Sequence, residues 1–360
     1  MPENDKGDAM TVRISSSRDA IRRMRESMMN NAEHAALEFL ESEHLKWSAV
    51  GAERSAAPVE TVAELVGAGG KRIRPEFCIS GYLAAGGDSG SDAVIAVAVA
   101  LEFLHTCALI HDDVMDDSSW RRGVPTAHVR HAADHRTNQW QGESRRFGEG
   151  VAILAGDLAL IYADDFMSEA GPVVAEAWAE LRAELIIGQH LDLVAAARFT
   201  SDPSLSRIIA RVKSGNYTIS RPLVLGALTA GRADLQQIFL EYGQAIGEAF
   251  QLRDDLLDLI SDTKILGKPA RLDFEQHKMT LLLSLAIARD PEVAALVTTP
   301  DGSAERLRTT LLDSGICDEV ETQISDLVAT GTKVITDADL DPEWRDELIE
   351  MAHAVAYRDK

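Results

Sequence analysis

The residues best suited to chemistry lie in one acidic segment, LIHDDVMDDSSWRRG at positions 109–123. The segment follows an apolar run with helical spacing and holds four aspartates and two arginines: Asp112, Asp113, Asp116, Asp117, Arg121 and Arg122. If the helix continues through the aspartates, Asp112 and Asp116 share one face, with His105 two turns before Asp112. Like charges at this spacing repel one another and weaken a helix. The pattern therefore favours a bound cation, with a solvent-exposed acidic helix end as the alternative.

Carboxylate ligands without nitrogen or sulfur are typical of a magnesium site. Mg²⁺ takes a few carboxylates and completes its coordination with water and substrate phosphates. The two arginines that follow could bind the same phosphates, because guanidinium groups form paired hydrogen bonds with phosphate oxygens. The segment thus predicts metal-assisted chemistry on a phosphate-bearing substrate.

The same DDxxD pattern occurs again in QLRDDLLD, inside another apolar helical run at positions 251–258. Asp254 and Asp258 share a face with Gln251, and Gly247 one turn earlier is expected to leave room beside them. Two such motifs are harder to attribute to chance in an acidic chain than one. Two carboxylate helices that face each other could hold metal ions between them, with a polyphosphate completing the coordination.

Side chains that could bind phosphate occur in three further segments: Lys71, Arg74, Lys213, Ser214, Lys268 and Lys278. The first two fall at the start of an expected helix, where free backbone N–H groups also attract anions. Lys213 interrupts a run otherwise suited to the core, and a buried lysine needs an anionic partner. A diphosphate would serve as that partner.

The chain of 360 residues carries 36 basic and 58 acidic side chains, which gives a formal charge of −22. This charge argues against nucleic acid and against an anionic membrane surface as partners. The three cysteines are scattered and form no CxxC pair, as expected in a reducing cytosol. The polar N-terminus lacks the apolar core of a signal peptide, and polar side chains interrupt the most apolar window, residues 93–110. We therefore expect a cytoplasmic protein with no transmembrane segment.

Helical periodicity runs through most of the chain, and no alternating Val/Ile/Thr-rich stretch is long enough for a sheet. We expect one all-α domain, a helical bundle over residues 18–360, preceded by a disordered polar tail over residues 1–17. Asp341 is expected to cap a last helix that has Pro342 in its first turn.

A run of histidines offers a second metal hypothesis. His128, His131 and His135 recur with helical spacing and would suit zinc on one helix face. No fourth ligand has matching spacing. A solvated basic helix explains the run better, so no zinc site is predicted.

Several motifs in order resemble the trans-isoprenyl diphosphate synthases, also called polyprenyl synthetases. The motifs are GGKRIRP at 69–75, LIHDDVMDDSSWRRG at 109–123, KSGNYT at 213–218, and QLRDDLLD with GKP at 251–269. Within the family, the chain looks most like the bacterial geranylgeranyl diphosphate synthases. The resemblance implies an all-α bundle around a deep central cavity, a homodimer, and Mg²⁺ as the cofactor.

The resemblance also implies roles for individual residues. It places Mg²⁺ on both acidic motifs, at Asp112, Asp116, Asp254, Asp255 and Asp258. The other catalytic residues are Asp113, Lys213 and Gln251. The allylic diphosphate would contact Arg121, Lys213, Ser214, Gln251 and Lys268, and isopentenyl diphosphate would contact Lys71, Arg74, His105 and Arg122. Lys278 would close over the allylic diphosphate, although Arg271 and His277 depart from the family pattern in its loop.

The implied reaction is the Mg²⁺-dependent, head-to-tail condensation of isopentenyl diphosphate with an allylic diphosphate. Breaking the allylic C–O bond leaves a diphosphate and a carbocation, which metal ions and basic side chains stabilise without a nucleophile. Water would quench the cation, so the cavity must be apolar and able to close. A class I terpene cyclase and a non-catalytic partner subunit are the alternatives, and two complete acidic motifs with their basic clusters disfavour both.

Product length is expected to depend on two small residues, Cys107 and Ala108. In the family, the positions five and four residues before the first aspartate border the growing tail. Five residues of helix rise about 7.5 Å, so small side chains here would let the tail pass this level. This predicts geranylgeranyl diphosphate (C20) rather than a farnesyl product, with C25 or longer left open.

Overall fold

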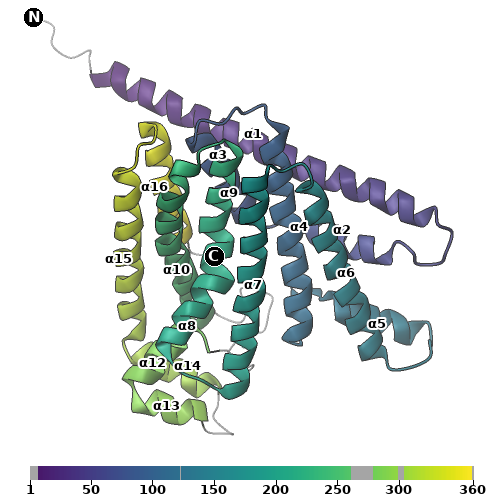
Figure 1. The fold of residues 1–360 in the computed structure, drawn as a ribbon. Helices are drawn as coiled ribbons and strands as arrows, with labels where there is room; N and C mark the ends of the chain where they lie inside the picture. The colour runs from purple at the N-terminus through teal and green to yellow at the C-terminus, as the bar shows by residue number, and fades with distance from the viewer. Residues whose placement is uncertain (1–6, 122, 261–278, 299–303, 359–360) are drawn as a thin grey trace, which may run out of the picture.

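The computed structural model describes residues 7–121, 123–260, 279–298 and 304–358. Apart from one short hairpin, these residues form helices joined by short loops, which confirms the all-α prediction (Figure 1). The helices are α1 (Gly7–Ser48), α2 (Ala57–Gly67), α3 (Ile73–Ala84), α4 (Asp92–Met115), α5 (Ala127–Thr137), α6 (Ser144–Phe166), α7 (Pro172–Arg198), α8 (Pro203–Ile209), η1 (Ala210–Ser220), α9 (Arg221–Thr229), η2 (Ala233–Leu235), α10 (Gln236–Ile260), α12 (Leu281–Arg289), α13 (Pro291–Thr298), α14 (Ala304–Asp313), α15 (Ile316–Thr336) and α16 (Pro342–Ala356).

α4 is the core helix that ends at the first acidic motif. Every residue from Val97 to Leu104 is buried, and the helix packs against α6, α3 and α1. By length and composition α4 could cross a membrane, but 67% of its most apolar window is buried inside the bundle. Its hydropathy is therefore that of a core helix, as the sequence predicts.

α1 crosses the outside of the bundle as its longest helix (Figure 1). It turns Met28, Ala36 and Leu40 into the core. The helix begins at Gly7, so the predicted boundary at residue 17 falls inside it. The division into a tail over residues 1–17 and a domain over residues 18–360 stays a prediction.

A small antiparallel hairpin follows α4 and places Arg121. β1 (Trp120–Arg121) pairs with β2 (Val124–Pro125), and Gly123 forms the turn at a φ of 80°. Glycine adopts this left-handed conformation at no steric cost. The hairpin turns the chain back so that Arg121 lies beside the end of α4.

The histidines of α5 are buried, so the prediction of a solvated helix was wrong. His128, His131 and His135 are 4%, 5% and 4% exposed, on the face of α5 that packs against α6. Each contacts a different partner: the ring of His131 lies 2.8 Å from the Thr61 hydroxyl, and His135 Nε2 donates to the Gln141 carbonyl at 3.1 Å. Their spacing marks an inward helix face, which the surrounding basic residues concealed.

The stability of the protein is expected to fall in mild acid because of His131. Burial, reinforced by the charge of Arg130, lowers the pKa of His131 from 6.5 to about 4. Below pH 6.5 the unfolded chain binds a proton that the folded chain does not, so stability is lost progressively toward pH 4. In His131→Gln, the free energy of unfolding from urea titrations should fall less between pH 7 and pH 4.5 than in the wild type. His34, exposed on α1, supplies the control His34→Gln, and equal slopes in all three proteins would contradict the assignment.

Candidate active site

The first acidic motif lies at the C-terminal end of α4. The helix ends at Met115, and Asp116 is its C-cap residue, whose N–H donates to the Asp112 carbonyl at 2.8 Å. The unpaired carbonyls at this end of a helix carry partial negative charge, which adds to the charge of the aspartates. The position thus favours a cation more strongly than an acidic patch on the side of a helix would.

Asp112 is bound by side chains from two other helices. Its Oδ1 accepts hydrogen bonds from Gln189 Nε2 on α7 at 3.0 Å and from Lys213 Nζ on η1 at 3.4 Å. Lys213 also forms an ion pair with Asp192, one turn beyond Gln189 on α7. The Asp112 side chain remains 24% exposed, so it is accessible to a ligand from solvent.

Asp113 points into the protein instead. It is 4% exposed, and Arg121 donates to both of its oxygens, from Nε at 2.9 Å and from Nη2 at 2.7 Å. Burial raises the pKa of the Asp113 carboxyl, and the Arg121 hydrogen bonds oppose this rise. The pair fixes Arg121 beside Asp112 and Asp116, whose charges help to raise the pKa of Arg121 against the effect of its burial.

The chain from α8 through η1 to α9 forms one continuous helical segment, and its middle section, Ala210–Ser220, is π-helical. π-helical turns are rare in proteins and occur frequently at functional sites. This section carries Lys213 and Ser214, as well as Tyr217 and Thr218 one turn later. The wider turns therefore set the directions in which these side chains project.

Gly215 of η1 and Gly247 of α10 hold the two helices in close contact. A Cβ atom added at Gly247 would lie 2.6 Å from the Cα atom of Gly215, closer than atoms can approach. Gly247 was expected to leave room beside Gln251 and Asp254, and that interpretation is corrected, because the backbone of η1 fills the space. The contact brings Lys213 and Ser214 next to Gln251 and Asp255.

The second acidic motif lies at the C-terminal end of α10. Asp255 is 7% exposed and accepts from Gln251 Nε2 at 2.9 Å and from the backbone N–H of Leu282 at 3.2 Å. It thereby fixes the start of α12, where Thr280 is the N-cap residue. Asp254, by contrast, is 44% exposed and forms an ion pair with Arg358.

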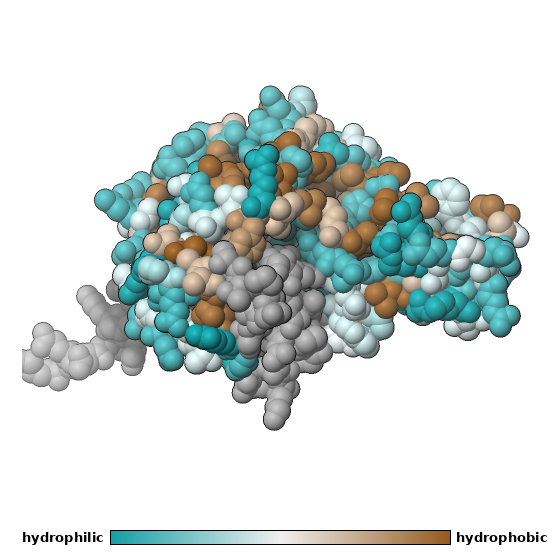
Figure 2. Space-filling model, turned by 90° about the horizontal axis from the view of Figure 1, so that it is seen from below, coloured by the Kyte–Doolittle hydropathy of each residue, from teal (hydrophilic) through white to brown (hydrophobic). Residues whose placement is uncertain are grey.

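The end of α10 and the start of α12 lie at the lower end of the bundle in Figure 1. Figure 2 shows this end from below, and the described surface there mixes apolar and polar side chains. A cavity of about 130 Å³ lies between α7, α8, η1, α10 and the start of α12. Predicted site residues form much of its polar lining: Lys213, Ser214, Gln251, Asp255 and Asp258. The other polar residues of the lining are Asp192, Ser206 and Thr280.

Two of the residues predicted for isopentenyl diphosphate gather around Tyr217. The Arg74 guanidinium lies 4.1 Å from the centroid of the Tyr217 ring and donates to Thr218 Oγ1 at 2.9 Å. His105 Nδ1 lies 3.1 Å from the Tyr217 hydroxyl oxygen. Burial raises the pKa of the Tyr217 hydroxyl above its ordinary value, so the hydroxyl stays protonated. Tyr217 thus connects α3, α4 and η1, and its contacts orient the side chains of Arg74 and His105.

Lys71, just before α3, interacts electrostatically with the second acidic motif. Burial lowers the pKa of Lys71, the positive charge of Arg358 lowers it further, and the negative charge of Asp254 opposes both. The basic segment before α3 is therefore electrostatically coupled to Asp254.

The chemistry of the acidic motifs fits Mg²⁺. They offer oxygen ligands, and each holds a cationic side chain against an aspartate, Lys213 at Asp112 and Arg358 at Asp254. Over residues 7–121, 123–260, 279–298 and 304–358, no three His, Cys, Asp or Glu side chains lie close enough together to hold an ion. Metal binding therefore requires side-chain movement or oxygen ligands from a substrate.

Three predicted site residues, Arg122, Lys268 and Lys278, lie outside the described residues, as do Arg271 and His277. Four other residues join the site although the sequence did not assign them to it: Gln189, Asp192, Tyr217 and Arg358. The first two lie three residues apart on one face of α7, which their spacing alone shows. Arg358 has no local signal, because it is 104 residues away in sequence from its partner Asp254.

Comparisons with known proteins point to one family. The sequence profile of the polyprenyl synthetase family matches residues 57–308. A short chain isoprenyl diphosphate synthase of Methanothermobacter thermautotrophicus is 36% identical over 236 residues, 63% of this chain and 66% of that protein. An octaprenyl diphosphate synthase of Escherichia coli is 30% identical over 308 residues, 82% of this chain and 88% of that protein.

A solved structure agrees with this result. The crystal structure of a geranylgeranyl pyrophosphate synthase from Corynebacterium glutamicum, complexed with isoprenyl diphosphate and magnesium, matches with a TM-score of 0.84. It is 36% identical in sequence, and the match covers 92% of this chain and 99% of that chain. The chain therefore belongs to the polyprenyl synthetase family and is an enzyme of the trans-prenyltransferase class.

Proposed function

We propose that the protein condenses isopentenyl diphosphate head to tail with allylic diphosphates and makes geranylgeranyl diphosphate. The observation that carries this proposal is the meeting of four helices around Lys213. Its ammonium group binds Asp112 of the first motif and Asp192 of α7, beside the cavity that Asp255 and Asp258 of the second motif line. Cations and carboxylates gathered in one cavity suit a diphosphate held through metal ions.

The two acidic motifs would hold Mg²⁺ in this proposal. The ligands would be Asp112, Asp116, Asp254, Asp255 and Asp258, and bound Mg²⁺ neutralises the charge of the diphosphate leaving group. Asp255 also anchors α12 through the Leu282 N–H, so its contribution is in part structural. Asp113 acts indirectly, by holding Arg121 beside the metal aspartates.

Side chains of the bundle would position the two substrates. Lys213, Ser214 and Gln251 line the cavity and would bind the allylic diphosphate. The allylic C–O bond breaks and its electron pair leaves with the diphosphate, to which Lys213 donates a hydrogen bond. The isopentenyl double bond then attacks the allylic cation, and the released diphosphate takes the proton that restores a double bond. Arg74 and His105 would hold isopentenyl diphosphate on the side of Tyr217.

A direct assay tests this function. The purified protein is incubated with Mg²⁺, isopentenyl diphosphate and either dimethylallyl, geranyl or farnesyl diphosphate, and dephosphorylated products are identified by mass spectrometry. We expect geranylgeraniol from at least one primer and no reaction without isopentenyl diphosphate. A cyclic hydrocarbon formed from the allylic substrate alone would indicate a terpene cyclase. No product from any primer would indicate a non-catalytic partner subunit.

Ala108 and Cys107 are proposed to let the C20 tail pass. Ala108 is half-buried one turn before Asp112, and Cys107 is buried with its Sγ 3.7 Å from His111 Nδ1. We expect Ala108→Phe and Cys107→Phe to shift the main product to farnesyl diphosphate, because a ring in a packed cavity cannot be bypassed cheaply. Cys107→Phe should also lower the melting temperature, since it overpacks the core. An unchanged product distribution in a folded, active Ala108→Phe variant would place the tail elsewhere.

We also propose a cytoplasmic homodimer that pairs through α6. This helix exposes Leu154 and Ile161, each 61% exposed and seven residues apart, so both lie on one face. Large apolar side chains exposed together on one face are typical of an interaction surface. Light scattering of the purified protein measures the mass directly, and a monomer would refute this part of the proposal.

A further inference from the structure

Arg358, which follows α16, reaches the head of the second acidic motif. Its Nη2 binds Asp254 Oδ1, and its guanidinium lies 4.0 Å from the centroid of the Phe250 ring. Phe250 and Asp254 are one turn apart on α10, so the ring and the carboxylate form a single binding face for the guanidinium. The Arg358 side chain is only 10% exposed, and its Nε is buried with no hydrogen-bond partner among the residues that the structure describes.

The last turn of α16 is fixed by the residue next to Asp254. Arg253 donates from Nε to the Ala356 carbonyl at 2.6 Å and forms two hydrogen bonds with Glu321, at 2.7 and 2.6 Å. Its guanidinium also lies 5.8 Å from the Tyr357 ring. Arg253 thus holds the main chain at the end of α16 against the acidic motif itself.

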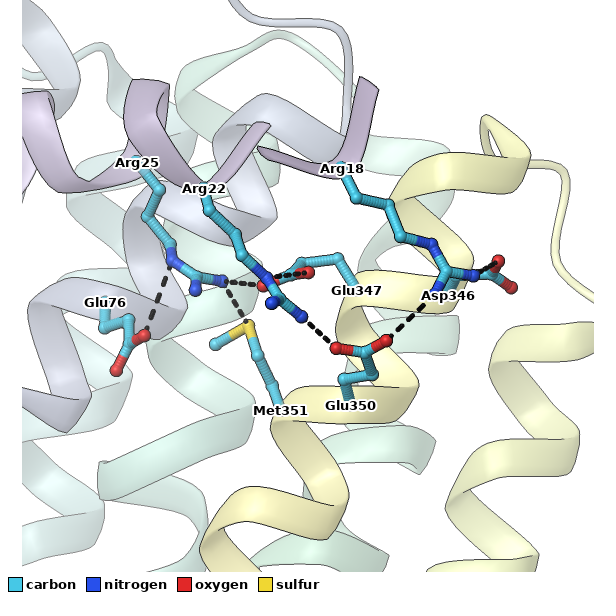
Figure 3. Close-up of polar contacts among 8 residues, drawn as sticks. All are labelled: Arg18, Arg22, Arg25, Glu76, Asp346, Glu347, Glu350 and Met351. Atoms are coloured by element: carbon cyan, nitrogen blue, oxygen red, sulfur yellow. Dashed lines mark hydrogen bonds and ion pairs between the residues drawn. The ribbon is translucent and has the colours of Figure 1, made fainter. Parts of the chain in front are cut away.

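The first turns of α16 are fixed by α1, as Figure 3 shows. Asp341 caps the helix as predicted, accepting from the Glu343 N–H at 2.8 Å. Glu347 is 2% exposed and pairs with Arg22 at 3.1 Å and Arg25 at 2.8 Å. A buried carboxylate with two guanidinium partners cannot shift without leaving a charge unpaired. α16 is therefore anchored at both ends, and its anchors place Arg358 on Asp254.

Arg358 occupies a position where positive charge is already plentiful. Lys71 and Arg74 both contribute their charge to the surroundings of Asp254. Three cations near one carboxylate repel one another, and a doubly charged ion arriving at Asp254 would strengthen that repulsion. Arg358 binds Asp254 directly, and only Tyr357 separates it from the Ala356 carbonyl that Arg253 holds.

We propose that Arg358 is a displaceable counter-ion, which holds Asp254 in the metal-free protein and gives up this carboxylate when a divalent metal binds. The inference rests on the proposed role of Asp254 as a metal ligand. The proposal predicts that the metal ion and Arg358 compete for Asp254. Metal binding at the second motif must break the Arg358–Asp254 ion pair, which costs binding free energy. Without Arg358 there is no such cost, so the metal should bind more tightly.

Metal binding without any substrate tests the proposal separately from the proposed function. Free Mn²⁺ is counted by electron paramagnetic resonance in titrations of the wild type and of Arg358→Gln, Arg358→Lys, Arg345→Gln and Asp254→Asn. Arg358→Gln should bind Mn²⁺ about tenfold more tightly, the factor expected when a charge-assisted hydrogen bond no longer competes. The Mn²⁺ affinity of Arg358→Lys should lie between those of the wild type and Arg358→Gln, because lysine keeps the charge but loses the planar contact with Phe250. Arg345→Gln, on α16 but bonded to the Thr336 carbonyl, should match the wild type.

Two results would overturn the proposal. The first is that Arg358→Gln binds Mn²⁺ no more tightly than the wild type does. The absence of Mn²⁺ binding in both proteins counts as this result. The other concerns hydrogen exchange, for which the Tyr357 N–H bonded to the His353 carbonyl at 3.0 Å is the reporter. Arg253 holds the Ala356 carbonyl in both states, so Mn²⁺ should leave exchange at this N–H unchanged while only the Arg358 side chain moves, and a loss of protection here would mean that the whole helix end is released instead. If Asp254→Asn and the wild type bind Mn²⁺ equally, the metal role of Asp254 fails instead, whatever the catalytic assay shows.

Discussion

The Asp112→Asn variant is expected to lose about a thousandfold or more in kcat, roughly 4 kcal/mol of transition-state stabilisation. Asn has the size of Asp but lacks the charge that Mg²⁺ requires. The side chain is 24% exposed and is not part of the hydrophobic core, so the variant should fold. The measurement is steady-state turnover against Mg²⁺ concentration, with circular dichroism as the test of folding.

Asp117 provides a matched control for this variant within the same motif. Its side chain is 87% exposed, and its φ of 51° lies in the left-handed region that Asn tolerates well. Asp117→Asn removes the same charge, four residues from Asp113 and outside the DDxxD spacing, and should leave turnover near the wild-type value. Near-full turnover with unchanged Mg²⁺ dependence in Asp112→Asn, or an equal loss in both variants, would refute the metal assignment at Asp112.

The helices and the two metal motifs could be predicted because their signals are local. A helix that must bury one face shows its period in the sequence, and α4 buries the residues that the period marks. The DDxxD spacing likewise places the first and last aspartate on one face without reference to the rest of the chain. A Pro after Asp341 predicts the start of α16 for the same reason.

The direction of neighbouring aspartates could not be predicted from spacing. Asp112 and Asp113 are adjacent in a helix and point about 100° apart, so one faces Lys213 and the other faces Arg121. Which of them is buried depends on the hairpin that returns Arg121 to the end of α4. The second motif divides in the same way, since Asp255 accepts from the Leu282 N–H at the start of α12 whereas Asp254 faces Arg358.

Contacts between distant segments account for the other differences. Gly247 has a packing role because Gly215 of another helix lies against it, and a glycine in a sequence does not reveal its neighbour. The histidines of α5 face inward because α6 covers them, although the charged residues Arg130 and Asp134 lie between them. Tyr217 was inside a recognised motif, but its contacts with Arg74 and His105 join three helices.

The Arg74→Ala variant should raise the KM for isopentenyl diphosphate about 10- to 100-fold, because a charge-assisted contact with phosphate contributes roughly 1.5–3 kcal/mol. Tyr217 and Thr218 hold the guanidinium from one side. Its Nε is buried without a hydrogen-bond partner within the described residues, so the group has donor capacity left for a ligand. The measurement is initial rate against each substrate in turn, with the other saturating.

Arg182→Ala separates substrate binding from a structural role for Arg74. Arg182 also lies over an aromatic ring, that of Trp178 at 5.5 Å, and its ion pair is with Asp164, which is not a site residue. Arg182→Ala removes a stacked arginine outside the site, so it should leave the KM values for isopentenyl diphosphate and for the allylic diphosphate unchanged. If Arg74→Ala raises mainly the KM for the allylic substrate, the two diphosphates occupy the reverse positions, with isopentenyl diphosphate on the Lys213 side. If it lowers kcat and stability together without changing either KM, Arg74 supports Tyr217 and binds neither substrate.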